Sequence, residues 1–289
     1  MRITLLGTSA GEGYPGFFCD CEHCHYARTH GGKNIRGNSS ALIDDDLLID
    51  MNAHSFEMFA RLGISPLGLR HLLVTHAHID HFDPQKLTQR AVWADIDAPS
   101  ETLHRQISPC MSRLPQMIVH GNACVRDAIE AVPGIMKNFD RYNFTFASIE
   151  NGRAEMWDDF SFIPVCSQHG PLPGFSHNYI LMRGGKTLLY ASDTGGYTPE
   201  MLEIIAAHRY DCVIMEGTFG LGASVDGHMS LEKNRRMLDF FVKHGLFKGK
   251  VNFILTHICP HWAPPHDLYE SIVNAEGMIL GYDGKIIEC

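Results

Sequence analysis

Residues 74–82 place four potential metal ligands within six positions, directly after an apolar, strand-like segment. The stretch reads Val-Thr-His-Ala-His-Ile-Asp-His-Phe, and its candidate ligands are His76, His78, Asp80 and His81. Side chains of an extended segment alternate between two faces, so His76 and His78 point to the same side. Asp80 and His81 follow where the chain turns, and they can face a second point nearby. One short loop can therefore serve two neighbouring metal sites, the geometry of a two-metal hydrolytic centre.

A second group of candidate ligands lies at residues 19–24, where Cys19, Cys21 and Cys24 form a C-x-C-x2-C cluster. Three thiolates in a tight loop are typical of a structural zinc site, which usually has four nitrogen or sulfur ligands. The cluster alone does not identify the fourth ligand, and the candidates are His23, His25 and the distant His261. The chain has nine cysteines, and an odd number disfavours a disulfide framework.

The order of predicted elements indicates two packed β-sheets with helices outside, within a single domain spanning residues 1–289. Short apolar segments rich in β-branched residues predict strands, including continuous ones at 154–166 and 278–288. Helical patterns lie between them at 54–62, 83–94, 121–132, 198–208, 230–244 and 266–276. No linker rich in Pro, Gly or Ser divides the chain. Segment 95–116, with three prolines, is interpreted as a lid or an insertion.

Together with four further residues, the histidine-rich loop resembles the metallo-β-lactamase superfamily. Those residues each end or follow a strand-like segment, and they are Asp50, His169, Asp193 and His257. The resemblance covers essentially the whole chain, and it implies an α/β (α+β) fold, the αββα sandwich of two mixed sheets.

The same resemblance implies two divalent cations and assigns their ligands. The first cation would take His76, His78 and His169, and the second would take Asp80, His81 and His257. Asp193 would bridge the two cations, and Asp50 would support the metal-binding loop. Mixed histidine and carboxylate ligands suit Zn, Mn and Fe alike, so the identity of the cations stays open.

The cysteine cluster narrows the resemblance to the phosphodiesterase branch that includes the PhnP family of cyclic-phosphate phosphodiesterases. The cluster is followed by Ala-Arg and then by Ser39 and Ser40, as in that branch. The branch completes its structural zinc with a histidine shortly after the last catalytic one, which favours His261. That spacing is four residues here and three in the branch, so Cys259 competes with His261 as the fourth ligand.

The resemblance implies catalytic roles for three residues, Asp80, Asp193 and His228. His228 lies before a predicted helix, where phosphodiesterases of this superfamily place a histidine that is not a metal ligand, and it could protonate the leaving oxygen. Three basic residues, Arg28, Lys33 and Arg36, could neutralise a substrate phosphate, although solvated surface charge is the alternative reading. The glycine-rich stretch 7–13 lacks the phosphate-loop pattern, and we expect it to line the cleft.

The resulting hypothesis is a phosphodiesterase that cleaves a small phosphodiester, such as a cyclic ribose phosphate, with a bridging hydroxide on a dinuclear metal centre. The alternatives are another hydrolase of this fold, acting on a lactone, thioester or β-lactam, a non-hydrolytic cofactor-biosynthesis protein, and a tRNA 3′-processing nuclease. The net charge of −9 disfavours nucleic acid and an anionic membrane surface as partners. The sequence does not decide whether the protein forms a homodimer. The N-terminus shows no signal peptide and no apolar run approaches about 20 residues, so we expect a cytoplasmic location.

Overall fold

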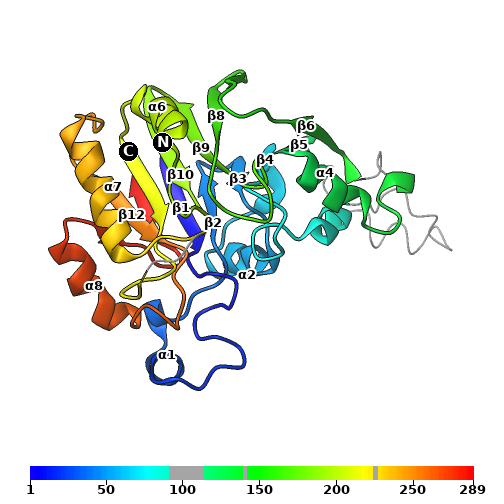
Figure 1. Ribbon diagram of the computed structural model, residues 1–289. Coiled ribbons are helices and arrows are strands. Elements are labelled where there is room, and N and C mark those ends of the chain that lie inside the picture. Colours follow the sequence, from blue (N-terminus) through cyan, green and yellow to red (C-terminus); the bar gives the residue numbers. More distant parts are fainter. Residues whose placement is uncertain (91–113, 139–141, 224–226) are drawn as a thin grey trace.

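The computed structural model describes residues 1–90, 114–138, 142–223 and 227–289 (Figure 1). Within them the strands form two seven-stranded sheets. From edge to edge, the first sheet contains β14 (Ile286–Glu288), β1 (Arg2–Gly7), β2 (Ser40–Ile43), β3 (Leu47–Ile49), β4 (His71–Leu73), β5 (Met117–Gly121) and β6 (Phe144–Ser148). The second contains β13 (Ile279–Leu280), β12 (Phe253–Thr256), β11 (Cys212–Glu216), β10 (Lys186–Ala191), β9 (His177–Arg183), β8 (Phe160–Cys166) and β7 (Glu155–Met156).

Both sheets are mixed, and each is antiparallel in one half and parallel in the other. Strands β14, β1, β2 and β3 pair antiparallel, whereas β3 to β6 pair parallel. In the second sheet β7 to β10 pair antiparallel, and β10 to β13 pair parallel. Parallel neighbours end at the same edge of a sheet, so the loops that follow them gather together.

Helices cover the outer face of each sheet, which confirms the predicted αββα sandwich. The described α-helices are α1 (Glu22–His30), α2 (Ala53–Arg61), α4 (Ala123–Glu130), α6 (Pro199–Ala206), α7 (Leu231–Lys243) and α8 (His266–Ala275). In Figure 1, α7 and α8 lie outside the second sheet, and α2 and α4 lie outside the first. No described helix has both the length and the apolar character that crossing a membrane requires.

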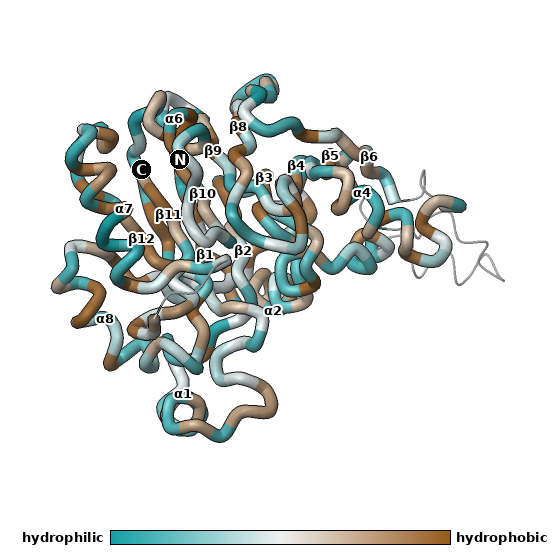
Figure 2. Tube along the Cα trace, in the orientation of Figure 1, coloured by the Kyte–Doolittle hydropathy of each residue, from teal (hydrophilic) through white to brown (hydrophobic). Residues whose placement is uncertain are grey.

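Three layers of buried side chains hold the sandwich together. Ile3 and Leu188 belong to the layer between the sheets. Phe241 of α7 belongs to the layer outside the second sheet, and Phe59 of α2 and Ile129 of α4 belong to the layer outside the first. Figure 2 shows the apolar character of the central strands β10 to β12. The buried apolar area of these layers supplies the main driving force for folding.

Three predicted elements differ in the structure. The helix expected at 83–94 is, in its described part, a 3₁₀ helix, η3 (Pro84–Arg90), and residues 91–94 lie outside the described residues. The first turn of η3 is closed by the Lys86 N–H, which donates to the Asp83 carbonyl at 3.1 Å. The strand expected at 154–166 is split into β7 and β8 by a turn in which Trp157 N–H donates to the Phe160 carbonyl. The strand expected at 278–288 is split into β13 and β14, which belong to different sheets.

The N-terminal segment differs as well. The cysteine cluster was expected in a loop, but Cys24 lies on helix α1, and Cys21 is its N-cap residue. The lid or insertion expected around 95–116 lies, except for residues 114–116, outside the described residues.

Candidate metal centre

Three histidine side chains converge from two loops to form a first ligand cluster. His76 and His78 follow β4, and His169 follows β8. His78 Nδ1 lies 2.9 Å from His76 Nε2 and 3.2 Å from His169 Nε2. These three ring nitrogens are within 4.8 Å of one another, so they can share one cation.

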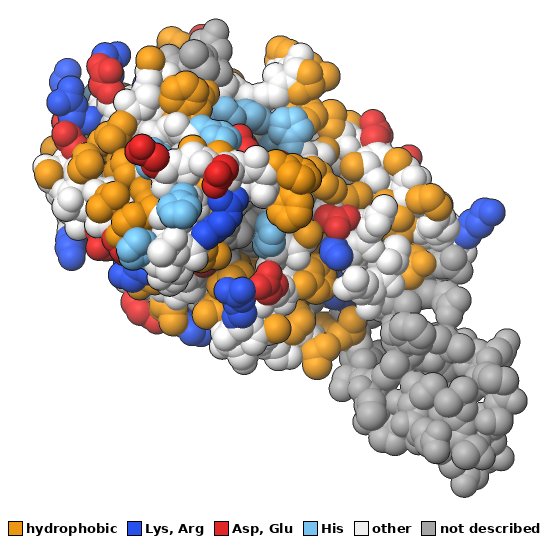
Figure 3. Space-filling model, turned by 90° about the horizontal axis from the view of Figure 1, so that it is seen from below, with side chains coloured by type: hydrophobic (Ala, Val, Ile, Leu, Met, Phe, Trp, Pro, Cys, Tyr) orange, Lys and Arg blue, Asp and Glu red, His pale blue; other side chains and the backbone are white. Residues whose placement is uncertain are grey.

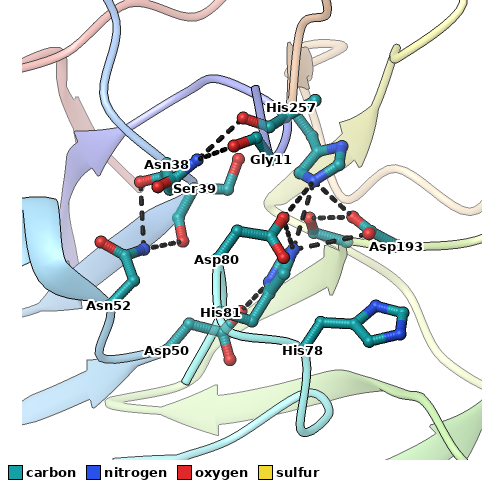
Figure 4. A network of polar contacts seen from close by, with 12 residues as sticks. Gly11, Asn38, Ser39, Asp50, Asn52, His78, Asp80, His81, Asp193 and His257 are labelled. Carbon is teal, nitrogen blue, oxygen red and sulfur yellow. Dashed lines mark hydrogen bonds and ion pairs between the residues drawn. The ribbon is translucent and has the colours of Figure 1, made fainter. Parts of the chain in front are cut away.

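A second ligand cluster lies beside the first and consists of Asp80, His81 and His257. His81 Nε2 is 3.2 Å from His257 Nε2. Asp80 Oδ2 is 3.4 Å from His81 Nε2 and 3.7 Å from His257 Nε2. Figure 4 shows the three side chains pointing toward one another and toward Asp193. His257 follows β12, so this cluster joins the two sheets of the sandwich.

Asp193 lies between the two clusters, at the end of β10. Its Oδ2 atom is 3.6 Å from His169 Nε2, 3.9 Å from His76 Nε2 and 3.4 Å from His81 Nε2. Its Oδ1 atom is 3.0 Å from His257 Nε2. This one buried carboxylate therefore faces ligands from both clusters, the position that a bridging ligand needs.

The Asp50 side chain supports the histidine-rich loop and does not face the space between the ligand clusters. Its buried carboxylate accepts hydrogen bonds from the Thr75 N–H at 2.8 Å and from His81 Nδ1 at 2.7 Å. The second contact leaves His81 Nε2 as the ligand atom. Both Asp50 and His257 have positive φ angles, of 61° and 56°, an uncommon conformation that Asp and His adopt more readily than most residues.

Electrostatics separate the histidines into two groups. Burial lowers the pKa of His76 well below its usual range, which keeps its ring neutral. Burial also disfavours charge on His81, but the Asp193 and Asp50 carboxylates outweigh it and raise the pKa of His81. Asp193 likewise raises the pKa of His257 against burial, to about 10. Because metal ligands must be deprotonated, a bound cation would displace the protons of His81 and His257.

A buried carboxylate that the sequence analysis did not single out, Glu216, holds His228 and Thr218 in the wall of the cavity. Glu216 Oε1 lies 2.8 Å from His228 Nδ1, and Oε2 accepts from the Thr218 backbone N–H at 3.0 Å. The Thr218 hydroxyl also contacts His257 Nδ1 at 2.8 Å. One carboxylate thus orients both His228 and, through Thr218, His257 of the second ligand cluster. In the sequence, the signal available for Glu216 was its position at the end of the strand β11, which corresponds to the position of Asp193 at the end of β10.

Both clusters open into a cavity of about 480 Å³. Among the described residues it is lined by Ala10, Gly11, Glu12, His78, Asp80, His169, Asp193, Thr218, Phe219, His228, His257, Cys259 and Trp262. The glycine-rich stretch therefore reaches the cleft, as expected, through Gly11 and Glu12. The aromatic residues Phe219 and Trp262 were not anticipated. Figure 3 shows a face of the molecule where histidine side chains reach the surface among hydrophobic ones.

The three cysteines of the N-terminal cluster are also brought together. The sulfur atoms of Cys19, Cys21 and Cys24 lie within 4.8 Å of one another. His261 Nδ1 is 3.8 Å from Cys19 Sγ, whereas His23 Nδ1 contacts the Pro260 carbonyl at 2.8 Å. Among the remaining candidates, Cys259 forms a separate group with Glu12 and His261, and His25 lies on the exposed side of α1. The arrangement favours His261 as the fourth ligand.

None of the three basic residues lines the cavity at the metal ligands. Arg28 donates to the Gly16 carbonyl at 2.9 Å. The buried Arg36 donates to the Thr8 hydroxyl at 2.7 Å and to the Gly281 carbonyl at 2.6 Å. Lys33 lies with Arg36 along another cavity, of about 700 Å³. Their phosphate-binding role stays a prediction.

Comparison with known proteins places this geometry in a family. The model of the β-lactamase superfamily domain matches residues 53–258, which is more than half of the chain. The protein is a member of the β-lactamase superfamily. The curated relatives of this member include coenzyme PQQ synthesis protein B of Acinetobacter baylyi. That protein is 25% identical over 280 residues, which cover 82% of this chain and 84% of the relative.

Solved structures share the fold of this β-lactamase superfamily member over its whole length. A diphosphatase from the PhnP family superposes with a TM-score of 0.72 at 20% identity, covering 100% of this chain and 97% of that one. Zinc-bound PqqB from Methylobacterium extorquens superposes with a TM-score of 0.73 at 16% identity, covering both chains fully. At these identities the likeness shows the fold alone.

The donor atoms of this superfamily member fit a pair of divalent cations. Lone pairs of neutral imidazoles within about 3 Å of one another repel unless a proton or a cation lies between them. Buried carboxylates next to them supply the negative charge that a cation requires. Nitrogen and oxygen donors with two carboxylates in the set suit Zn, Mn or Fe.

Proposed function

We propose that this protein is a metal-dependent phosphodiesterase acting on a small phosphate ester, linear or cyclic. The observation that carries the proposal is His228, which lines the same cavity as the two ligand clusters and belongs to neither. Its Nδ1 atom is held at 2.8 Å by Glu216, a carboxylate with no solvent exposure. Hydrolysis of a diester needs a proton for the leaving oxygen, and His228 would provide it.

The ligand clusters would hold two divalent cations. His76, His78 and His169 would hold one, Asp80, His81 and His257 the other, and Asp193 would contact both. When bound, such cations supply Lewis acidity at a phosphoryl oxygen and positive charge that stabilises the transition state.

His228 would donate the proton from Nε2, because Nδ1 is engaged by Glu216. Burial disfavours the charged form of His228, but the hydrogen bond and charge of Glu216 outweigh burial and raise the pKa of the imidazole. The raised pKa keeps a larger fraction of His228 protonated near neutral pH, the state that a general acid requires. Glu216 is therefore a positioning residue that also favours the acidic form of His228.

The test compares two leaving groups in the His228→Ala variant. Adenosine 2′,3′-cyclic phosphate releases a basic alkoxide, whereas bis(p-nitrophenyl) phosphate releases a weakly basic phenolate that needs little protonation. We expect kcat to fall by about 10²–10⁴ on the cyclic ester and by less than about tenfold on the aryl ester. Glu216→Gln should give the same pattern with a smaller loss. The control is His244→Ala, at an exposed histidine that ends α7.

Equal losses on both substrates would contradict the acid role of His228. A variant that keeps full activity on the cyclic ester would do the same. The thioester alternative is examined with the same variant, because a thioester releases a weakly basic thiolate that needs little protonation. The lactone alternative is examined by direct assay of a lactone, because its alkoxide leaving group gains from a proton as the cyclic ester does.

A second candidate is a role in cofactor biosynthesis without diester hydrolysis. It is favoured by the curated relatives, which are coenzyme PQQ synthesis protein B at 24–27% identity. Elemental analysis separates the two candidates in part: fewer than two cations per chain beyond the cysteine-bound zinc would favour the second.

A further inference from the structure

Two aromatic side chains form one wall of the catalytic cavity. Phe219 and Trp262 both line it, with ring centroids 5.7 Å apart and ring planes inclined at 74°. Trp262 keeps 47% of its surface exposed although it lies beside buried metal ligands. Phe219 also contacts the ring of His228, at 5.7 Å between centroids. The wall therefore reaches from the proposed proton donor to the mouth of the cavity.

The loop at 217–222 fixes the wall in place. A Cβ atom on Gly222 would lie 2.5 Å from Trp262 Cε3, so only glycine permits this contact. The Leu221 N–H donates to the Trp262 carbonyl at 3.0 Å, and the Gly222 N–H donates to the Phe219 carbonyl at 2.6 Å. An exposed indole held this firmly presents a preformed flat surface, which stacks on aromatic rings at low entropic cost.

The carboxylates that line the cavity have no lysine or arginine among the described lining residues. These carboxylates belong to Glu12, Asp80 and Asp193. Asp80 and Asp193 belong to the ligand clusters, but Glu12 lies outside the two catalytic clusters and is exposed at the rim. Two bound cations would offset the single charge of a phosphodiester, and Glu12 would repel any further anionic group.

We infer that the wall and Glu12 select a phosphodiester whose organic part carries a flat aromatic ring, such as a nucleobase, and no second anionic group. The inference rests on the proposed function and names its substrate class. A cavity of about 480 Å³ is in the range of small-ligand sites. Stacking on Trp262 gives affinity, and Glu12 excludes substrates with an additional phosphate.

The test uses three substrates that share the scissile group. They are adenosine 2′,3′-cyclic phosphate, the same compound with a 5′-phosphate, and the 2′,3′-cyclic phosphate of methyl riboside, which lacks the base. The expected kcat/KM is highest for the first. A higher kcat/KM for either of the other two overturns the inference.

Variants assign the preference to its residues. Trp262→Leu should raise KM for the adenosine substrate about 10- to 100-fold and change kcat/KM on the base-free substrate less than threefold, and Trp262→Phe should restore most of the loss. Glu12→Gln should raise kcat/KM on the 5′-phosphorylated substrate. Phe18→Ala, an exposed aromatic outside the cavity, and Glu203→Gln, an exposed carboxylate of α6, are the matched controls. An equal effect of Trp262→Leu on both ring-bearing and base-free substrates overturns the role of the wall.

A binding measurement separates this inference from the proposed function. Adenosine carries no phosphate, so calorimetric titration of adenosine into the metal-loaded protein reports the wall alone. Binding that is lost in Trp262→Leu and kept in Phe18→Ala supports the wall even if no diester is hydrolysed, in which case only the proposed function fails. The absence of adenosine binding, or binding that Trp262→Leu leaves unchanged, overturns the inference.

Discussion

Asp50 contacts His81, a candidate metal ligand, on the ring nitrogen that faces away from the ligand clusters. Its carboxylate contacts His81 Nδ1 at 2.7 Å, and the Thr75 N–H holds that carboxylate in place. Neither side chain of the Asp50–His81 pair is exposed to solvent. Outer partners of this kind orient the ring and increase the basicity of the ligand nitrogen.

Replacing Asp50 with asparagine should therefore weaken metal binding while keeping the shape of the side chain. The expected loss is about 10- to 100-fold in affinity for the cation held by Asp80, His81 and His257. Competition with a chelator of known affinity measures it. The control is Asp45→Asn, at a carboxylate with 79% side-chain exposure. Unchanged affinity in Asp50→Asn would show that His81 does not depend on this partner.

The candidate site residues that the sequence predicted differ from those it missed in whether they belong to a recognisable motif. The ligand histidines and aspartates form an ordered set of motifs at strand ends, so their order identifies them even where a single residue is ambiguous. Glu216 and Trp262 belong to no such motif. Glu216 ends a strand, but only its hydrogen bond to His228 reveals its role, and only the position of Trp262 in the cavity reveals that of the indole.

At the scale of elements, the N-terminus of α2 is joined to the loop that carries Asn38. The N-cap residue Asn52 accepts from the Ser55 N–H at 3.1 Å, and its amide donates to the Asn38 and Ser39 carbonyls. Asn52→Ala should lower the free energy of unfolding by about 2–4 kcal/mol, because a cap and the partners of two buried carbonyls are lost together. Thr198→Ala, which removes only the cap of α6, should cost about 1 kcal/mol. Urea denaturation compares them, and equal losses would contradict the joining role.

The segment around α1 has little apolar packing of its own. In the nine-residue helix only Cys24 and Ala27 are buried. We therefore expect the zinc at the cysteine cluster to hold the segment in place, and Cys24→Ser to remove one metal ion per chain and to expose residues 12–31 to proteolysis. Elemental analysis and limited digestion measure both effects. Cys124→Ser is the control, because this cysteine of α4 lies outside the cluster. An unchanged metal content would exclude the cluster as a zinc site.

The same lack of apolar periodicity explains why α1 could not be predicted. Helix prediction relies on a buried stripe, and residues 22–30 present Glu, His, Arg and Thr over most positions. Strand β9 (His177–Arg183), in contrast, contains a run of apolar residues, which is a strand signal in the sequence. The split of 154–166 was missed because Trp157 and Phe160 flank the turn with apolar side chains.

At the scale of the whole molecule, the sandwich brings together loops that are distant in sequence. The parallel strands β3 and β4 of one sheet and β10 to β12 of the other end near the same space, where Asp50, Asp193, Glu216 and His257 follow them. Sequence order could predict that these strand ends carry chemistry. It could not give the distances between the sheets, which the packing of their buried faces determines.

Buried histidines away from the site make stability depend on pH. Burial lowers the pKa of His120 to about 3 and that of His177 to about 4. The unfolded chain binds these protons at about pH 6.5, so stability is full above that pH and is lost as pH falls toward the folded-state values. His120 alone should cost about 2 kcal/mol between pH 7.5 and pH 5.

His120→Gln should reduce that pH dependence. His120 Nε2 lies 3.1 Å from His71 Nδ1, a contact that a glutamine amide can replace, and the ring is enclosed by Trp157 and Phe162. Denaturant midpoints at pH 7.5, 6 and 5 should fall less steeply in the variant than in the wild type. Parallel slopes would show that other groups control the acid sensitivity.

The central claim, hydrolysis of a phosphodiester at the two ligand clusters, is tested most directly by turnover of adenosine 2′,3′-cyclic phosphate. The protein is loaded with defined Zn, Mn or Fe, and its metal content is counted in the same sample. Protein with two cations at this centre should carry out multiple turnovers, and His76→Ala should abolish them. Protein that holds both cations and leaves this ester and bis(p-nitrophenyl) phosphate intact would contradict the claim.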